Sequence, residues 1–405
     1  MQHRSNDPSR RPAQGLLKLL FAALVLSGCG GGGSGDAAPT SSAFAVGPIT
    51  GFGSVIVNGV RFDDSTAHVT DDDDGPRRSD ELRLGMMAEI QSAGISSDSS
   101  GSHATARTIR FGSEIVGPVF SIAADGTSLV VLGETVKVSV TTLFDERLVG
   151  GLAALVAGTT VVEVNGLFDV ATGTYTATRI ESKPAAPAFK LRGTVTGIDK
   201  TAHTLRIGSG TETISYDAIA AAVPAALDNG LLVRVRLQTT KVAGKWIATG
   251  ITSGVRKLDD HDEAELEGTI GASTFAADRK FSVNGIAVDA SKASFPNGTD
   301  GIVLGARVEV KGAAAGGVIV ATRVSIETEH ERELAGFELH GTLSALDAGA
   351  KTFVLRGVTV SFASATLEVR KGVLTDLANG KKLEVRGVRS ADGTTLVASR
   401  IGFED

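Results

Sequence analysis

The stretch with the most distinctive chemistry in this sequence is TDDDDGPRRSDE, in which four consecutive aspartates, Asp71–Asp74, precede Gly75. Calcium is bound by several carboxylate and carbonyl oxygens on a sharply turning backbone. With Gly75 at the sixth position of a calcium-loop template, Asp72, Asp74 and Glu81 fall on ligand positions. These three residues are the candidate metal ligands, and calcium is the one cofactor for which we find ligands in the sequence.

The same loop departs from this template. Thr70 occupies the first ligand position, where aspartate is usual, and no helical pattern flanks the loop. Arg77 and Arg78 supply cations that can neutralise the carboxylates. We therefore favour a solvated acidic loop and keep calcium binding as the alternative.

The histidines are scattered along the chain and give no second metal site. None has the HxxxH or HExxH spacing that directs two imidazoles at one zinc ion. His261 lies in DDHDE, within an expected linker, so we interpret it as part of a solvated charged segment.

Signatures of common enzyme classes are absent from the sequence. It contains no GxSxG nucleophile elbow and no GxxxxGK[ST] phosphate loop. Its single cysteine, Cys29, is the predicted site of lipidation and so does not serve as a nucleophile. Carboxylates are abundant, and two of them can pair in space for glycoside hydrolysis. We expect a non-catalytic protein, and the alternative is a hydrolase with a carboxylate pair in one repeat or at an inter-domain cleft.

Three glutamates recur in closely related phrases, VVEVNG, RVEVKG and KLEVRG. They are Glu163, Glu309 and Glu384. Each faces away from its apolar neighbours in an alternating strand. Such a row is either a multivalent binding surface or a means of keeping exposed strand faces soluble, and we favour solubility.

Nucleic-acid binding is not expected. The net charge of −6 opposes contact with phosphate backbones. One Trp and two Tyr offer little for base stacking, and the 16 Phe lie largely in alternating strands, where core packing is the better explanation.

The N-terminus predicts export and a lipid anchor. Basic residues precede LLFAALVL, an apolar run too short to span a bilayer, so we assign residues 1–28 to a signal peptide. The following LSGC resembles the lipobox of bacterial lipoproteins, which makes Cys29 the lipidated residue and the membrane a partner through this anchor. Residues 29–44, rich in Gly and Ser, form a flexible tether. The residue after Cys29 is glycine rather than aspartate, and in this the sequence resembles lipoproteins that are held in the outer membrane.

Internal repeats organise the rest of the chain. The glycine that opens each Val–Glu–Val phrase or its looser version recurs in steps of 73, 72, 75 and 75 residues, at Gly85, Gly158, Gly230, Gly305 and Gly380. A strand-starting glycine and an A-x-x-[IV] motif recur in the same order, in steps of 70–77 residues. Five copies of about 70 residues are too long for solenoid repeats, so each is a small domain.

Within each copy the expected order is three strands, a loop or short helix, and two more strands. In the fourth copy, Asn284 and Gly285 mark a hairpin between the second and third strands. This is the strand order of the OB-fold, a Greek-key barrel. The sequence therefore predicts an all-β tandem array of about five small OB-like Greek-key barrels, each with five to six strands. A solenoid with one shared core and an open sandwich are the alternatives.

The expected domains follow from these landmarks. Their boundaries are 45–112, 113–183, 188–255, 264–327 and 335–405. The segments KPAAPAFK, RKLDDHDEA and TEHEREL between copies are proline-rich or charged, which is typical of exposed linkers.

The first copy carries a family resemblance. GPITGFGSVIVNGVRFDDSTAHVTDDDD, followed by LRLGMMAEI, closely resembles the bacterial domain of unknown function numbered 5666 (DUF 5666) from Gly47 to Ile90. Later copies, to Ile401, keep the strand pattern with weaker similarity and lack both GFGS and the aspartate run. The resemblance implies an exported protein, often a lipoprotein with tandem copies, and it assigns no activity and no catalytic residue.

The sequence thus predicts a non-catalytic lipoprotein of the Gram-negative cell envelope, held in the outer membrane and displaying five barrels in a binding or structural role. Tandem copies raise effective concentration, which favours multivalent weak contacts with an envelope polysaccharide or protein. Neither the ligand nor the oligomeric state follows from the sequence.

The calcium alternative has a direct test. A calcium-stabilised array would melt at a lower temperature once a chelator is added, because bound metal stabilises only the folded state. We expect the melting midpoint of the chain in a calcium-containing buffer to be unchanged when a chelator is added. A lower midpoint would restore Asp72, Asp74 and Glu81 as calcium ligands.

Overall fold

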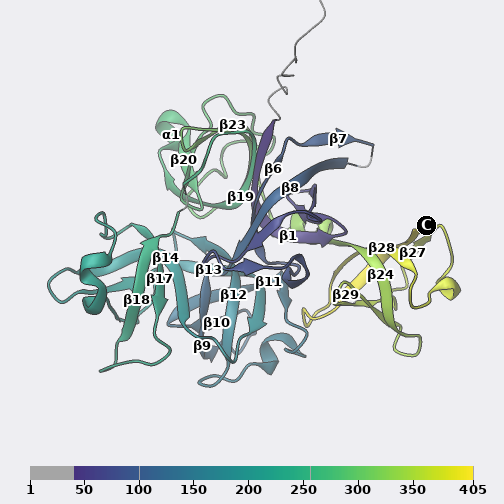
Figure 1. Cartoon of the computed structure of the whole chain (residues 1–405), viewed down its shortest axis with the longest axis horizontal. Helices are drawn as coiled ribbons and strands as arrows, with labels where there is room; N and C mark the ends of the chain where they lie inside the picture. The colour runs from purple at the N-terminus through teal and green to yellow at the C-terminus, as the bar shows by residue number, and fades with distance from the viewer. Residues whose placement is uncertain (1–40, 100, 256, 405) are drawn as a thin grey trace, which may run out of the picture. The chain divides into compact units, whose positions relative to one another are not determined.

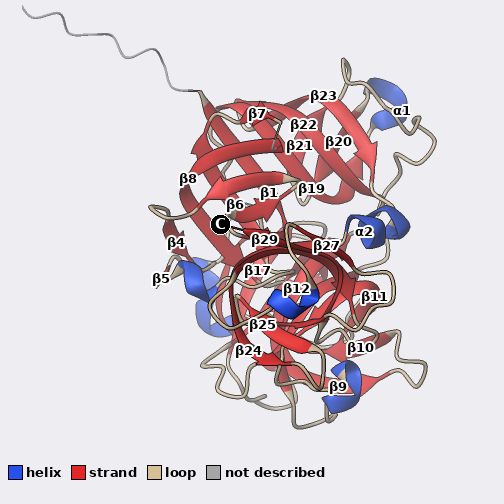
Figure 2. Cartoon of the chain, turned by 90° about the vertical axis from the view of Figure 1, so that its right-hand side faces the viewer, coloured by secondary structure: helices blue, strands red, loops and turns tan. Residues whose placement is uncertain are grey.

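The computed structural model describes residues 41–405 except 100, 256 and 405. The predicted signal peptide, Cys29 and most of the predicted tether lie outside the described residues. Within the described part, alternating sequences form strands and glycine-rich segments form tight turns, so strands dominate and helices are short (Figure 2). The helices in this part of the chain lack the length and apolar character that crossing a membrane requires.

Five groups of strands follow one another along the chain, and each forms a barrel, numbered here 1 to 5 (Figure 1). Barrel 1 contains β1 (Ser42–Phe52), β2 (Val55–Val57), β3 (Val60–Asp63), β4 (His68–Thr70), β5 (Pro76–Arg77), η1 (Ser79–Glu81), β6 (Met87–Ala93), β7 (Ser96–Asp98) and β8 (Gly101–Gly112). Barrel 2 contains β9 (Ile115–Ile122), β10 (Ser128–Val131), β11 (Glu134–Phe144), η2 (Gly151–Ala154), β12 (Val161–Asp169) and β13 (Thr174–Ser182).

The remaining elements follow the same order. Barrel 3 contains β14 (Phe189–Asp199), β15 (Thr204–Ile207), β16 (Ile214–Ser215), η3 (Asp217–Ala222), β17 (Leu232–Leu237) and β18 (Trp246–Ser253). Barrel 4 contains β19 (His261–Ser273), α1 (Phe275–Asp278), β20 (Lys280–Val283), β21 (Ile286–Asp289), β22 (Arg307–Ala315) and β23 (Val318–Ile326), and α2 (Glu329–Ala335) follows it. Barrel 5 contains β24 (Phe337–Asp347), β25 (Thr352–Leu355), β26 (Val358–Ser361), β27 (Glu368–Arg370), η4 (Leu374–Asp376), β28 (Lys382–Arg389) and β29 (Leu396–Glu404).

Every barrel closes through the same pattern of strand pairing. In barrel 2, β9 pairs with β10, β10 with β11, and β12 with both β13 and β9, all antiparallel. The parallel pair β11–β13 completes the ring. The corresponding parallel pairs are β3–β8, β16–β18, β21–β23 and β26–β29. The predicted all-β tandem array of small barrels is confirmed.

The Val–Glu–Val phrases alternate across the barrel wall as predicted. In β22, Val308 and Val310 are 0% exposed, whereas Glu309 between them points away from the core. Burying the two valines stabilises the barrel by roughly 1.5–3 kcal/mol each. The outward face of the same strand is left for polar contacts.

The hairpin predicted at Asn284 and Gly285 is also confirmed. Val283 pairs with Ile286 across the turn, and φ is 51° at Asn284 and 88° at Gly285, the left-handed values of a two-residue hairpin. The Asn284 amide donates to the Glu267 carbonyl at 3.1 Å, which ties the turn to the first strand of the barrel.

The first strands join the barrels to one another. β1 pairs in parallel with β19, Ala43–Val46 against Glu263–Leu266, and also with β24 of barrel 5 (Figure 1). β9 pairs antiparallel with β14. The buried side chains form three apolar clusters, one in barrels 1 and 5 with Leu143 of barrel 2, one in barrels 2 and 3, and one in barrel 4 with Phe44 and Leu258. The barrels are therefore neither separate beads nor a solenoid around one core.

Two of the predicted linkers contain regular structure. His261 is the first residue of β19 and stacks on Phe44 with ring centroids 5.5 Å apart, so its assignment to a solvated linker was wrong. Burial lowers the pKa of His261. TEHEREL forms most of α2, where Thr328 and Glu331 make reciprocal capping hydrogen bonds. The Thr-x-x-Glu spacing is a helix start signal that the sequence reading missed.

One ionisable side chain lies deep between barrels 2 and 3. Glu134, the first residue of β11, is 1% exposed, and its Oε2 has no hydrogen-bond partner among the described residues. The N–H of Gly210 in barrel 3 donates to its carboxyl. Burial raises the pKa of Glu134 to about 8, so this carboxyl is protonated at neutral pH.

The substitution Glu134→Gln tests this burial. The pKa of Glu134 in the folded protein, about 8, lies above its ordinary value of 4.5. The contribution of this protonated carboxyl to the free energy of unfolding is therefore fully present below pH 4.5 and is lost as pH rises towards 8. We expect the wild-type free energy of unfolding to fall across this window, by up to ~1.4 kcal/mol per pH unit, relative to the variant. Urea unfolding followed by the fluorescence of Trp246, the single tryptophan, measures it.

A matched control is available on α2. Glu333→Gln removes an exposed carboxyl and should keep the wild-type dependence on pH. Parallel stability curves for wild type and Glu134→Gln would contradict the assignment.

Candidate functional site

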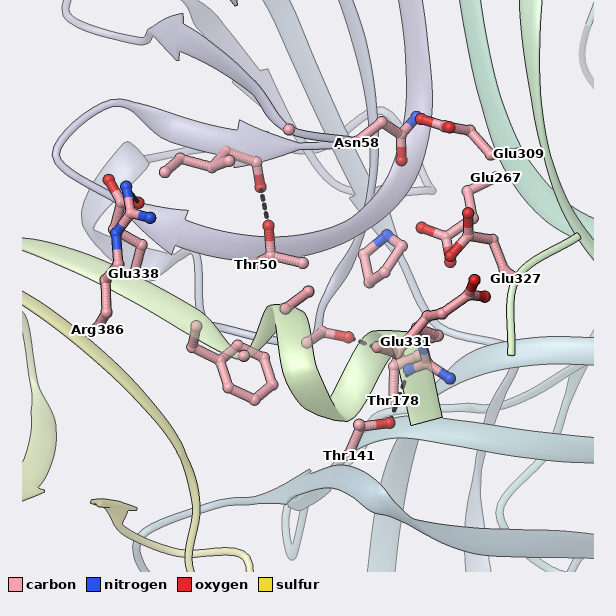
Figure 3. Close-up of a pocket in the computed structure, with 18 of the residues that line it drawn as sticks. Thr50, Asn58, Thr141, Thr178, Glu267, Glu309, Glu327, Glu331, Glu338 and Arg386 are labelled. Atoms are coloured by element: carbon pink, nitrogen blue, oxygen red, sulfur yellow. Dashed lines mark hydrogen bonds and ion pairs between the residues drawn. The ribbon is translucent and has the colours of Figure 1, made fainter. Parts of the chain in front are cut away.

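A cavity of about 390 Å³ lies where residues of barrels 1, 2, 4 and 5 meet beside α2 (Figure 3). Its polar lining is rich in glutamate, with arginines on two sides. The polar lining residues include Thr50, Asn58, Arg61, Thr141, Thr178, Glu267, Glu309, Glu327, Glu331, Arg332, Glu338 and Arg386. We call it the acidic cavity.

The first pair of carboxylates comes from barrel 4. Glu267 on β19 is the direct cross-strand partner of Glu309 on β22, so two like charges face each other. Such a pair is unfavourable unless cations neutralise it. Arg307 donates its Nε–H to Glu267 at 2.7 Å, and the Lys311 ammonium lies 3.3 Å from Glu309 and 3.0 Å from Glu265. One lysine thus serves two carboxylates.

Glu327 is the carboxyl left over in this cluster. It follows β23, and its backbone N–H donates to the Arg307 carbonyl at 2.9 Å, but no side-chain partner for its carboxyl is found among the described residues. Figure 3 shows it beside Glu267 and Glu331. Burial and the charges of Glu267, Glu309 and Glu331 raise the pKa of Glu327 to about 7.

Helix α2 brings one anion and one cation to the cavity. Glu331 accepts from the Thr328 backbone N–H at 3.0 Å and is held in place as the third residue of the helix. Arg332 lies 3.0 Å from Glu329 and donates to the Thr141 hydroxyl of barrel 2 at 2.8 Å. Burial lowers the pKa of Arg332 to about 10. The helix therefore anchors to barrel 2 while it lines the cavity.

The opposite wall is an ion-pair network around Glu338 on β24. This carboxylate lies 2.6 Å from Arg61, 2.8 Å from Arg386 and 2.7 Å from His340. His340 also contacts Glu404 at 2.7 Å through its other ring nitrogen. Burial acts to raise the pKa of Glu338, but the hydrogen bonds from His340 and Arg61 outweigh it and hold the pKa at about 2. The hydrogen bond to Glu338 raises the pKa of His340.

The same network contains a group of potential metal ligands. Glu338, His340 and Glu384 offer ligand atoms within 4.8 Å of one another, and they are the one such group among the described residues. Two guanidinium groups already contact Glu338, and Glu384 lies 3.3 Å from Arg386. We interpret the group as an ion-pair network, because cations of the protein fill the positions that a metal would take.

The three predicted calcium ligands face different basic side chains. Asp72 contacts Lys190 and Arg234 of barrel 3, and Asp74 lies 3.4 Å from Arg110. Glu81 lies 3.8 Å from Arg77, and it does not form a ligand group with the two aspartates. The predicted lipidation site, Cys29, lies outside the described residues.

The recurring glutamates each have a basic neighbour. Glu163 pairs with Lys183, Glu309 with Lys311 and Glu384 with Arg386. Of the three, only Glu309 lines the acidic cavity. The sequence reading missed Glu267, Glu327 and Glu331, because barrel packing and α2 bring them together.

Comparison with known families agrees with the repeats. Residues 116–181, 267–325 and 340–402 match the family described as "Domain of unknown function (DUF5666)". These segments fall in barrels 2, 4 and 5, for which the sequence predicts a weaker likeness than for the first copy, so the similarity to this domain repeats in three of the barrels. A search of curated proteins gave no match.

The substitution Glu338→Gln tests the ion-pair network. The folded pKa of about 2 lies below the ordinary 4.5, so the contribution to stability is present above pH 4.5 and is lost as pH falls towards 2. We expect the variant to be about 1–3 kcal/mol less stable at pH 6, because Arg61 and Arg386 lose their shared partner. Urea unfolding at pH 6 and pH 3 should show the difference shrinking.

Glu368→Gln, in an exposed ion pair of the same barrel, serves as the control and should stay close to wild type. NMR titration of His340 should give a lower pKa in Glu338→Gln. An unshifted His340 would contradict the network.

Proposed function

We propose that this chain of tandem DUF5666 domains is a non-catalytic lipoprotein of the bacterial envelope, anchored through Cys29, whose OB-like barrels act together as a binding platform. The observation that carries the proposal is the acidic cavity, to which four barrels contribute and in which the Glu327 carboxyl has no side-chain partner among the described residues. Binding at a meeting point of barrels uses surfaces that no single copy has.

The strand order supports the OB-like assignment. Each ring runs from the first strand through the second and third to the fifth and fourth, with the third and fifth parallel. A short helical turn or loop separates the third and fourth strands, as the OB order requires. Fold alone does not give function, so the ligand is inferred from the cavity.

The charge of the cavity favours a cationic ligand. Arg307 pairs with Glu267 and Lys311 is shared between Glu309 and Glu265, so the charges of Arg307 and Arg332 act on Glu327 without a direct ion pair to its carboxyl among the described residues. An amine or guanidinium group entering the cavity would supply the missing positive charge. A volume of about 390 Å³ suits a small ligand or one basic side chain of an envelope protein or an amino sugar of an envelope glycan.

A second candidate function has some support. A carboxyl with a pKa of about 7 beside other carboxylates is typical of a general acid, and this favours the hydrolase alternative. However, Arg307 and Lys311 already contact Glu267 and Glu309, so neither is free to act as nucleophile or base. Binding is the better account of the cavity.

Titration with spermidine, a small polyamine, tests the proposed site. A cation binds the ionised form of Glu327, so affinity should rise about tenfold between pH 6 and pH 8 as this group ionises. Glu327→Gln should weaken binding at pH 8 at least tenfold and remove the dependence on pH. Calorimetry at both pH values measures these effects.

Glu333→Gln, which removes an exposed charge from the same helix, is the matched control and should bind as wild type does. Equal affinity of wild type and Glu327→Gln would contradict the site. A pull-down with the chain from residue 36 onward, alone and as Glu327→Gln, would then identify the envelope glycan or protein retained. Turnover of a glycan or ester that is lost in Glu327→Gln would favour the hydrolase instead.

A further inference from the structure

Four basic side chains gather on one face of barrel 3. The antiparallel pairing of β14 and β17 places Lys190 opposite Arg236 and Arg192 opposite Arg234. Leu191, which alternates with them, is buried in the core. Like charges directly across two strands repel each other, so this face requires anions to be stable. We call these four residues the basic face.

The anions come from other barrels. Asp72 of barrel 1 has a side chain only 6% exposed, lies 2.8 Å from the Lys190 ammonium and contacts Arg234. Asp73 lies 2.5 Å from Lys190 and 3.2 Å from Arg236. The remaining cation, Arg192, is 3.0 Å from Glu114 of barrel 2. Two successive carboxylates of the aspartate run thus occupy three of the four cations.

The loop is shaped to present these two carboxylates. Asp71 accepts the backbone N–H groups of Asp73 and Gly75 at 3.0 and 2.8 Å and pairs with Arg77 at 2.7 Å. Asp71 therefore holds the turn, and the two residues after it reach barrel 3. The side chain of Arg110 also donates to the backbone carbonyl of Asp72. A cavity of about 860 Å³ lies beside these contacts and leaves room for other groups to approach the basic face.

We propose that the basic face of barrel 3 is a binding site for acidic peptide segments, and that Asp71–Asp74 is its resident occupant and acts as an exchangeable latch between barrels 1 and 3. The occupant seen in the structure is itself an acidic peptide, so the site accepts a run of carboxylates on an extended backbone. Guanidinium groups suit such oxygens because of their fixed fork of donors.

The contacts are graded in a way that permits exchange. Asp73 and Arg236 are 41% and 47% exposed, so salt screens their contact, whereas Asp72 is shielded from water. A partner segment can therefore displace the outer contact before the inner one. The latch has the advantage of tethering, because a covalently attached occupant is present at an effective concentration on the order of millimolar.

A labelled peptide with the sequence of residues 69–77 is the probe, added to the full chain. Wild type should bind it weakly, since the attached loop competes for the same face. Asp72→Asn/Asp73→Asn should bind it at least tenfold more tightly. Adding Arg234→Gln/Arg236→Gln to that variant should abolish binding, and a peptide with asparagine at both positions should not bind. Fluorescence anisotropy measures all four.

Asp125→Asn/Asp347→Asn changes the net charge equally at exposed positions of barrels 2 and 5 and should behave as wild type. Equal peptide affinity in wild type and Asp72→Asn/Asp73→Asn would overturn the proposal. Binding that survives the loss of both arginines would also overturn it, as would binding of polyphosphate by the latch variant without binding of the peptide.

A second measurement needs no variant. In wild type saturated with the peptide, amide hydrogen exchange of residues 70–75 should accelerate severalfold, because the displaced loop loses its contacts. Unchanged exchange at saturation would mean that the peptide binds elsewhere, which overturns the proposal. Spermidine binding at the acidic cavity should be the same in Asp72→Asn/Asp73→Asn as in wild type. The proposals for the acidic cavity and for the basic face can therefore be contradicted separately.

Discussion

Each barrel depends on the parallel pairing between its third and fifth strands. In barrel 2 this pairing runs from Val136 against Tyr175 to Phe144 against Ile180, and it is the contact that turns an open sheet into a ring. A closed ring has no unpaired strand edge along its own wall and holds a filled apolar interior. With the interiors closed, the outward faces of the strands are free to specialise.

The outward faces are where the copies differ. On barrel 4 the cross-strand pair is Glu267 and Glu309, and on barrel 3 it is Arg192 and Arg234. A pair of like charges on an exposed strand is a cost to an isolated barrel. On barrel 3 the assembled chain offsets this cost with Asp72 of barrel 1, whereas on barrel 4 Arg307 of the same barrel contacts Glu267. Between barrels 1 and 3, electrostatic complementarity therefore joins the two copies.

The fold could be predicted to a large extent because its signals are local. Glycine spacing, alternating valines and the Asn-Gly turn at Asn284 act within one copy, and each predicts an element that the structure contains. The acidic cavity could not be predicted in this way, since folding of barrel 4 and α2 brings Glu267, Glu327 and Glu331 together and other copies supply the rest of the lining. The composition of Asp71–Asp74 marks this loop as unusual, but its partners cannot be predicted, because Lys190, which contacts Asp72, lies 118 residues further along the chain.

Because β1 pairs with both β19 and β24, its pairing can be completed only after those two strands have formed. The backbone of Ser42 bonds to a side chain 220 residues further along the chain, and β24 lies further still. During synthesis from the N-terminus, barrel 1 emerges well before these neighbours, and part of its first strand then lacks its partners. Contacts of such long sequence separation form late and leave an unprotected strand edge in the meantime. A protein built in this way has reason to depend on chaperones until its last barrel has been synthesised.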